Sequence, residues 1–256
     1  MATLRIAHLT DLHLTADPKH MRWRTLERIL DILRTQVDPI DRIVLTGDIA
    51  KTRFEGVYPA LRELLQPWWH KLRLVPGNHD HRDQIQSLFG PRLTAVGSKS
   101  VFTEDLAGVR LIGLDTARPF RVSGRLGTTQ LSWLNEQLAT RLPTLLFMHH
   151  PPLPIGAWWL GKDLLRDRKA FATILRGKPV LALVCGHVHQ PFDGTFHGTR
   201  VLTTPSTAYQ FHPTSFIPRT TAAPPAFRVL EVEHAVITST AMHQVLVPTE
   251  VDCPHR

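Results

Sequence analysis

Seven side chains of the types that bind transition metals occur in five short motifs, and each motif directly follows an apolar run. They are two carboxylates, one amide and four imidazoles: Asp11, His13, Asp48, Asn78, His149, His187 and His189. A structural zinc ion takes four ligands, so a set of seven is too large for one such site. The set predicts two neighbouring metal ions that share the Asp48 carboxylate.

The spacing within two of the motifs favours ligands that act in pairs. Asp11 and His13 are two residues apart, and so are His187 and His189. In an extended chain such residues project to the same face, so each pair can bind one site from one side. A glycine precedes three of the ligand positions, where the backbone must turn sharply or pass close to the site.

The ligand types indicate both the metal and the reaction. Oxygen and imidazole ligands without a thiolate favour iron, manganese, zinc or cobalt. Two divalent ions facing two carboxylates leave a net positive charge, which a phosphoester anion would neutralise. Two metals about 3.5–4 Å apart can produce a hydroxide near neutral pH and hold the attacking and leaving oxygens. The expected chemistry is therefore phosphoester hydrolysis.

Each motif has an ordinary structural explanation when it is taken alone. An Asp-x-His pair is more often a surface pair, and a Gly-Asp step is usually a turn. The Gly-Asn-His-Asp run at 77–80 could be a loop held by local side-chain hydrogen bonds. His187 and His189 follow an apolar run, where buried imidazoles need partners. The five motifs together, each at a strand end, favour the metal site.

The elements that must position these motifs alternate between strand-like and helix-like patterns. Strands are expected at residues 4–10, 42–46, 71–75, 144–149 and 180–185, with hairpins around Gly108 and over 227–245. Apolar residues at steps of three or four predict helices at 23–37, 57–65, 128–138 and 162–175, with a short one after His81. Thr128 or Thr129 is the expected N-cap of the third helix.

This order of elements favours an α/β sandwich of two sheets flanked by helices. In open α/β sheets, ligands bind beyond the carboxyl ends of the strands, so separate motifs can meet at one point. The 256 residues are enough for one large domain, and we expect residues 1–256 to form it. Residues 190–256 are expected to complete the second sheet and its rim.

Composition limits the classes of partner and location. The net charge of +8 favours anionic partners, but the basic residues are dispersed rather than gathered in an arm. A small anionic phosphodiester is the expected partner and nucleic acid is not, while a homo-oligomer is left open. Because no apolar run is long enough for a membrane span and no signal peptide is recognisable, the sequence predicts a cytoplasmic protein.

The motifs resemble the pattern of the calcineurin-like metallophosphoesterase superfamily. That pattern is D-x-H, G-D, G-N-H-[D/E], H and G-H-x-H, and the sequence matches all of it. The resemblance implies a four-layer αββα sandwich with a binuclear metal centre. It implies one ion bound by Asp11, His13, Asp48 and His189, and a second bound by Asp48, Asn78, His149 and His187.

The resemblance also assigns roles around the substrate. It implies that His79 is a catalytic imidazole beside the substrate and that Asp80 orients it. The residues implied to contact the substrate are His13, Asp48, Asn78, His79 and His189.

Departures from the pattern narrow the resemblance. Protein Ser/Thr phosphatases carry GDxxDRG and GNHE, whereas this chain has GDIAKTR and GNHD. Purple acid phosphatases place a tyrosine ligand where this chain has Lys51. The runs HHPP from His149, CGHVHQPF from Cys185 and TPSTAYQF from Thr204 are instead similar to class III cyclic-nucleotide phosphodiesterases and related glycerophosphodiesterases.

This similarity implies hydrolysis of 3′,5′-cyclic AMP to 5′-AMP, with a metal-bridging hydroxide as nucleophile and His79 as proton donor. One alternative is another phosphoester: a glycerophosphodiester, a nucleotide or a nucleic acid. A non-catalytic scaffold is a further alternative, but such scaffolds usually lose metal ligands and all seven are present. The choice between cyclic AMP and cyclic GMP is left open, as is the choice among iron, manganese and zinc.

Several residues near the motifs have open roles. Trp158 and Trp159 could stack on a nucleobase or pack under their loop. Tyr209 and Phe211 could line the substrate cleft or pack on the second sheet, and packing is favoured for Phe211. His150 could support its neighbour His149 or lie at the surface. The Pro/Thr-rich loop at 212–225 has no assigned role.

Overall fold

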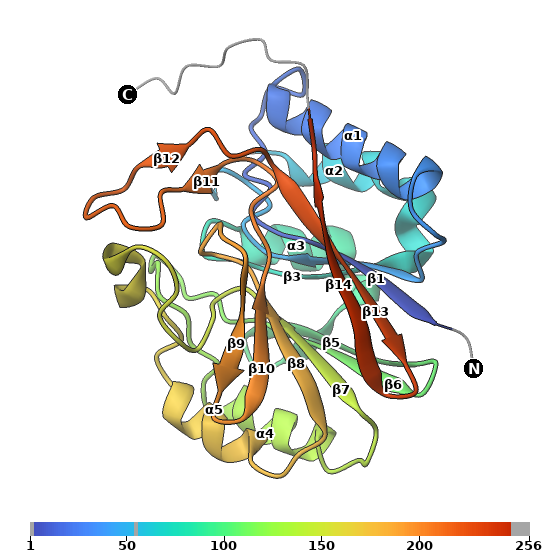
Figure 1. Cartoon of the computed structure of the whole chain (residues 1–256), viewed down its shortest axis with the longest axis vertical. Helices are drawn as coiled ribbons and strands as arrows, with labels where there is room; N and C mark the ends of the chain where they lie inside the picture. Colours follow the sequence, from blue (N-terminus) through green and yellow to red (C-terminus); the bar gives the residue numbers. More distant parts are fainter. Residues whose placement is uncertain (1–2, 54–55, 247–256) are drawn as a thin grey trace.

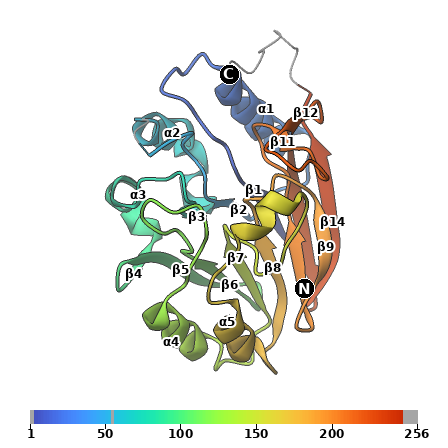
Figure 2. The ribbon, with the colours of Figure 1, turned by 90° about the vertical axis from the view of Figure 1, so that its left-hand side faces the viewer.

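Two β-sheets packed face to face form the centre of the molecule. The computed structural model describes residues 3–53 and 56–246. Helices cover the outer face of each sheet, so the layers run helix, sheet, sheet, helix (Figure 1 and Figure 2). The four-layer αββα sandwich expected from the sequence is confirmed.

The first sheet has five strands in the order β14-β13-β1-β2-β3. Three of them run parallel: β1 (Leu4–Leu9), β2 (Arg42–Thr46) and β3 (Leu72–Val75). Two antiparallel strands extend it beyond β1: β13 (Ala226–Glu233) and β14 (Val236–Gln244). Its outer face packs against α1 (Met21–Thr35), α2 (Tyr58–Leu64) and α3 (Arg82–Phe89), with short 3-10 turns at η1 (Gln66–Lys71) and η2 (Gly90–Arg92).

The second sheet has seven strands in the order β4-β5-β6-β7-β8-β10-β9. Its strands are β4 (Thr94–Val96), β5 (Lys99–Leu106), β6 (Val109–Leu114), β7 (Thr144–Met148), β8 (Val180–Cys185), β9 (Phe192–Phe196) and β10 (Thr199–Thr203). β6, β7, β8 and β10 run parallel. Its outer face packs against α4 (Thr128–Gln137) and α5 (Arg168–Leu175). A 3-10 turn, η3 (Trp158–Lys162), and the short pair β11 (Gln210–Phe211) and β12 (Thr220–Thr221) lie beyond the sheets.

The expected strands are present, and the helix bounds lie within two residues of the predicted ones, except at the start of the fourth helix. The first helix ends at Thr35, two residues before the predicted end. The helix predicted over 162–175 begins only at Arg168, because the preceding residues form η3 and a loop. The third helix is preceded by Gly127, whose φ of 82° suits glycine, and not by a capping threonine.

The C-terminal segment contributes to both sheets. β9 and β10 extend the seven-stranded sheet, whereas β13 and β14 join the five-stranded one. The last part of the segment, 247–256, lies outside the described residues. The assignment of the whole chain to one domain stays a prediction.

Side chains alternate between an outer core and an inner core, as the two-residue period of a strand requires. In β2, Ile43 and Leu45 face the helices, whereas Val44 faces the other sheet. Leu145 and Phe147 of β7 meet Val44 in the inner core from the opposite side. Because both faces of each central strand are buried, the strands are almost continuously apolar until they end.

A buried polar pair, His8 and its cross-strand neighbour Arg228, interrupts the inner core. His8 of β1 is fully buried between the sheets, with Nε2 2.7 Å from Thr46 Oγ1 and Nδ1 2.6 Å from Thr204 Oγ1. Thr46 belongs to the first sheet and Thr204 follows β10 of the second, so the imidazole links the two. Burial and the nearby Arg228 guanidinium lower the pKa of His8 to about 3.

His8 should make stability fall on acidification. The unfolded imidazole takes up a proton below pH about 6.5, whereas the folded one does not until pH about 3, so acid favours unfolding in between. Between pH about 6.5 and about 5, His8 should contribute a loss of about 2 kcal/mol in the free energy of unfolding. For His8→Gln, urea denaturation at the two pH values should show a decrease in the free energy of unfolding that is about 2 kcal/mol smaller than in the native chain. The exposed control His70→Gln should behave like the native chain, and equal pH slopes in all three would contradict the role of His8.

Candidate metal centre

The seven predicted ligands come together at one end of the sandwich. Asp11 and His13 follow β1, Asp48 follows β2 and Asn78 follows β3 in the first sheet. The second sheet supplies His149 after β7 and two imidazoles after β8, His187 and His189. Their ligand atoms form overlapping groups in which every atom lies within 4.8 Å of the others, and Asn78 Oδ1 lies 3.1 Å from His149 Nε2. The site therefore spans both sheets.

The backbone at these residues is bent rather than extended. Five of the seven ligands have positive φ, between 45° and 70°: Asp11, His13, Asp48, His187 and His189. The expectation that each i, i+2 pair lies on one face of an extended chain is therefore wrong in its geometry. Non-glycine residues seldom adopt this conformation, and it persists where surrounding contacts enforce it. Here the loops after β1 and β2 are bonded to each other, with Asp11 N donating to Gly47 O and His13 N to Asp48 O.

Two glycines permit the close approach of these loops. A Cβ atom at Gly77 would overlap the Asp48 carboxylate, and one at Gly186 would overlap Thr10 Oγ1. Thr10 Oγ1 in turn donates to Asp11 Oδ2, which also accepts from His187 N at 2.9 Å. The Asp11 carboxylate thus joins the ends of β1 and β8.

The protons of the imidazoles point away from the centre of the site. His189 Nδ1 lies 2.7 Å from Tyr209 O, and a carbonyl only accepts, so this nitrogen carries the proton. Its Nε2 then presents a lone pair to Asp11 Oδ1 at 3.2 Å and to His13 Nε2 at 3.1 Å. In the same way His149 Nδ1 donates to Thr46 O, which leaves its Nε2 facing Asn78 Oδ1.

A cation fits this arrangement. Among the described residues, Asp11 Oδ1 and His187 Nε2 are buried and accept no hydrogen bond. A buried carboxylate oxygen and a buried ring nitrogen that lack hydrogen-bond partners can both be satisfied by one metal ion. The residues therefore fit a metal-binding site of oxygen and nitrogen ligands.

The carboxylates dominate the electrostatics of the site. Burial alone would raise the pKa of Asp48, but the neighbouring imidazoles, His149 first, hold it well below its usual range. Burial would likewise lower the pKa of His149, but Asp48 and Asp11 outweigh it and raise that pKa to about 9. Burial dominates at His13 and His187, whose pKa values fall to about 3. Both of these rings are neutral at pH 7 and can act as ligands.

His79 lies at the mouth of the site. Its side chain is 41% exposed and its Nε2 is 3.8 Å from Asp48 Oδ2. Nδ1 lies 2.7 Å from Lys51 O and its backbone N donates to Asp48 Oδ1, so ring and backbone are both held. The hydrogen bonds of the predicted partner Asp80 go to other groups, so its role in orienting His79 stays a prediction and would act through the backbone.

Asp80 instead holds backbone. Its Oδ1 accepts from the amides of Ile49 and Ala50 and from the Tyr58 hydroxyl, and its Oδ2 accepts from Gly77 N at 2.8 Å. These bonds tie the loop after β2 to the loop after β3. Tyr58 was not found by sequence reasoning, and its position at the start of a helix gave no sign of this contact.

His150 supports the centre from behind, as one of its two expected roles requires. It is fully buried, and its ring centroid is 4.7 Å from that of His149 and 4.6 Å from that of His187. Both nitrogens are used: Nε2 donates to Val122 O, which leaves Nδ1 to accept from Thr116 Oγ1 at 2.7 Å. Because no lone pair remains, His150 positions its neighbours and is not a ligand.

An aromatic wall stands beside one half of the site. The Phe211 ring stacks on His189 with centroids 4.3 Å apart, and Trp159 meets Phe211 edge-on at 4.9 Å. Tyr209 lies 5.2 Å from His13, measured between ring centroids. Trp158 points outward with 65% exposure, and Lys162 Nζ lies 3.9 Å from its ring. Trp159 thus packs in the wall, whereas Trp158 does not.

Comparison with known proteins identifies relatives over nearly the whole chain. Residues 4–191 match the calcineurin-like phosphoesterase family. The 3′,5′-cyclic adenosine monophosphate phosphodiesterase CpdA of Escherichia coli is 33% identical over 95% of this chain and 90% of its own length. A cAMP/cGMP dual specificity phosphodiesterase of Mycobacterium tuberculosis is 32% identical over 80% of this chain and 67% of its own.

The fold also occurs among solved structures. A dimetal phosphatase from Danio rerio superposes with a TM-score of 0.62 at 15% identity, covering 94% of this chain and 96% of that one. Within the residues that the structure describes, no helix has the length and apolar character needed to cross a membrane.

The contacts of Asp80 predict a structural role that can be separated from that of His79. In Asp80→Asn the new amide must face at least one N–H donor, so a charge-assisted bond is lost and the free energy of unfolding should fall by about 2–4 kcal/mol. Tyr58→Phe removes one hydroxyl and should cost about 1 kcal/mol. Urea denaturation should show little change for His79→Ala and for the exposed control Asp193→Asn. If Asp80→Asn were as stable as the native chain, the proposed role of Asp80 in joining the loops after β2 and β3 would be contradicted.

Proposed function

This chain belongs to the calcineurin-like phosphoesterase family, and from that premise we propose that it hydrolyses a 3′,5′-cyclic nucleotide, foremost cyclic AMP, to the 5′-monophosphate. The similarity to a cyclic AMP phosphodiesterase over 95% of the chain carries the choice of substrate. The complete set of seven converging ligands argues against a scaffold without activity. The cytoplasmic location predicted from the sequence is part of this proposal.

The proposed centre holds two divalent ions that share Asp48. Asp11, His13, Asp48 and His189 would bind one, and Asp48, Asn78, His149 and His187 the other. The Asp48 Oδ2 atom supports this division, since it lies 3.9 Å from His13 Nε2 and 3.4 Å from His149 Nε2. When bound, the ions make water nucleophilic at neutral pH and offset the negative charge of the phosphate.

His79 is proposed to give a proton to the departing ribose oxygen. Its Nδ1 proton is engaged by Lys51 O, so the donated proton must be a second one on Nε2, and the proposed donor is the imidazolium form of the ring. The partly exposed ring allows that substrate to approach. A ribose alkoxide is a poor leaving group, and a positioned imidazole can supply its proton. His13, Asp48, Asn78 and His189 border the same space and would position the phosphate.

The aromatic wall is proposed to receive the nucleobase. Tyr209 and Phe211 are partly buried beside His13 and His189, with a face or edge left for a planar group. A base stacked there would distinguish a cyclic nucleotide from a glycerophosphodiester, which has no aromatic group. This feature favours the nucleotide over the other phosphoesters that the motifs allow.

Asp48→Ala should lose both ions, because its carboxylate serves each of them. The native chain, purified with manganese or iron supplied, should retain about two ions. Asn78→Ala should retain about one ion, since Asn78 contacts only the His149 half of the site. Elemental analysis after gel filtration would measure the content, with Asp193→Ala as an exposed control. A full complement of metal in folded Asp48→Ala would rule out the shared carboxylate.

His79→Ala should affect substrates according to their leaving group. Hydrolysis of cyclic AMP should slow by about 10²–10⁴, because its alkoxide needs a proton. Hydrolysis of bis-p-nitrophenyl phosphate should slow far less, because nitrophenolate leaves without one. Steady-state kcat/KM on both substrates would measure this, with His70→Ala as control. Equal losses would exclude proton donation by His79, and an absence of cyclic-nucleotide turnover with manganese, iron and zinc would overturn the proposed substrate.

A further inference from the structure

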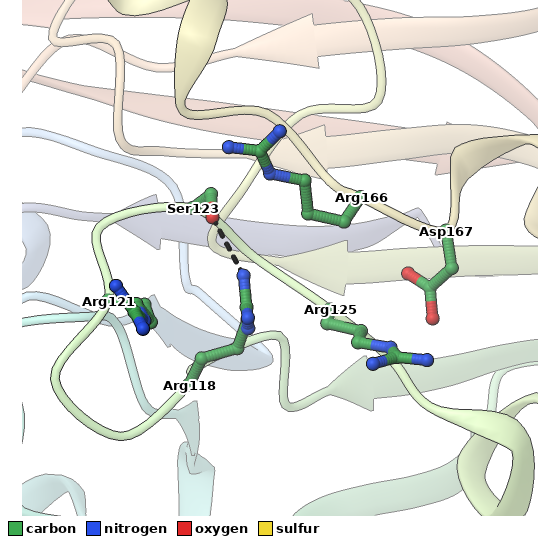
Figure 3. A pocket seen from close by; sticks show the side chains of 6 residues that line it. All are labelled: Arg118, Arg121, Ser123, Arg125, Arg166 and Asp167. Carbon is green, nitrogen blue, oxygen red and sulfur yellow. Dashed lines mark hydrogen bonds between the residues drawn. The ribbon is translucent and has the colours of Figure 1, made fainter.

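Four arginines surround an open pocket beside the second sheet. Arg118, Arg121 and Arg125 lie on the loop between β6 and α4, and Arg166 lies just before α5 (Figure 3). Ser123 and Asp167 complete the lining, and the pocket has a volume of about 530 Å³. None of these residues belongs to the metal centre or to the aromatic wall.

The positive charge of this pocket is poorly compensated. Its lining holds four guanidinium groups and one carboxylate, Asp167, a net charge of +3, and Asp163 outside the lining interacts electrostatically with Arg166. Asp167 is itself engaged, because its two oxygens accept from the backbone N–H groups of Leu126 and Gly127. In residues 3–53 and 56–246, none of the four arginines forms an ion pair. Gathered like charges raise the local potential and attract anions.

The arginine-bearing segments are fixed before any ligand binds. Gly124 N donates to Leu164 O, and Arg166 N donates to Gly124 O at 2.9 Å, so the two segments are bonded to each other. Arg118 Nη1 also donates to Ser123 Oγ at 3.0 Å, across the loop (Figure 3). Backbone bonds between the two segments keep the four arginines close together, which lowers part of the entropy cost of binding an anion there.

His150 separates the pocket from the metal centre. Its Nε2 donates to Val122 O on the arginine loop, and a Cβ atom at Gly124 would overlap its ring. The other side of the same ring lies against His149 and His187. An anion among the arginines is therefore a different species from a phosphate that contacts the metal ligands.

We propose that this pocket binds a small anion with several phosphate groups, such as a pyrophosphate or a nucleoside polyphosphate. Guanidinium groups bind phosphate oxygens in pairs, and several of them around one space match several linked phosphates better than a single one. The arginines are confined to one pocket and do not form a stripe, which favours a small ligand over a nucleic acid strand. This inference is independent of the proposed phosphodiesterase activity.

The test measures binding of the full, metal-loaded chain to adenosine 5′-(β,γ-imido)triphosphate, whose imido bridge resists hydrolysis. Isothermal titration would compare the native chain with Arg121→Ala/Arg166→Ala, in which both side chains are exposed and make no hydrogen bond that the structure describes. The matched control is Arg168→Ala/Arg176→Ala, which removes the same charge outside the pocket, at the first residue of α5 and the residue after its end. Binding to the metal centre is common to all three proteins and cancels in the comparison.

The pocket variant should bind the probe at least about tenfold more weakly than the native chain and the control. Orthophosphate should bind all three alike, since one phosphate cannot reach several arginines. Equal affinity of the three proteins for the imidotriphosphate would overturn the proposal. It would also be overturned if the pocket variant lost affinity only for a short single-stranded RNA or for anionic phospholipid vesicles, because the occupant would then be a macromolecular surface.

Discussion

The main constraint on this structure is the candidate metal centre. There the oxygen and nitrogen atoms of carboxylates, an amide and imidazoles lie within about 3 Å of one another and are buried. His149 and His189 direct their Nδ1 protons outward to main-chain carbonyls, so the Nε2 atoms that face inward are placed to bind a cation. The carboxylates of Asp11 and Asp48 supply the negative charge that draws such a cation in. The folded chain meets this requirement with residues from five strand ends that are far apart in sequence.

The surrounding backbone is shaped by the same requirement. Five ligands adopt the left-handed conformation, and their loops approach so closely that Gly77 and Gly186 have no room for a side chain. Buried hydrogen bonds from Asp80 and from Asp11 hold these loops in place. Strain concentrated at a functional site must be balanced by favourable contacts elsewhere, and here the apolar cores on both sides of each sheet provide them.

Sequence patterns were sufficient for the ligands and for most of the sheets. The motifs combine residue type with position at the end of an apolar run, and both are visible in a linear chain. Contacts that depend on packing across the sandwich were not visible. The link from His8 to Thr204 joins residues 196 positions apart. The hydrogen bond that the Tyr58 hydroxyl donates to Asp80 joins the start of α2 to the loop after β3. The pattern over 162–175 predicted one helix, but the backbone N–H groups of Leu165 and Arg166 bond to distant carbonyls, so the helix begins only at Arg168.

The division of the ligands between the sheets has a consequence for the life of the protein in a cell. Because Asp11 and Asp48 come from one sheet and His149 and His187 from the other, a bound cation acts as a cross-link through the sandwich. A metal at about 100 times its dissociation constant would add about 2.7 kcal/mol to the free energy of unfolding. When metal is scarce, the emptied chain opens more often and meets proteases more often. The abundance of the protein, and not only its activity, would then follow the supply of metal.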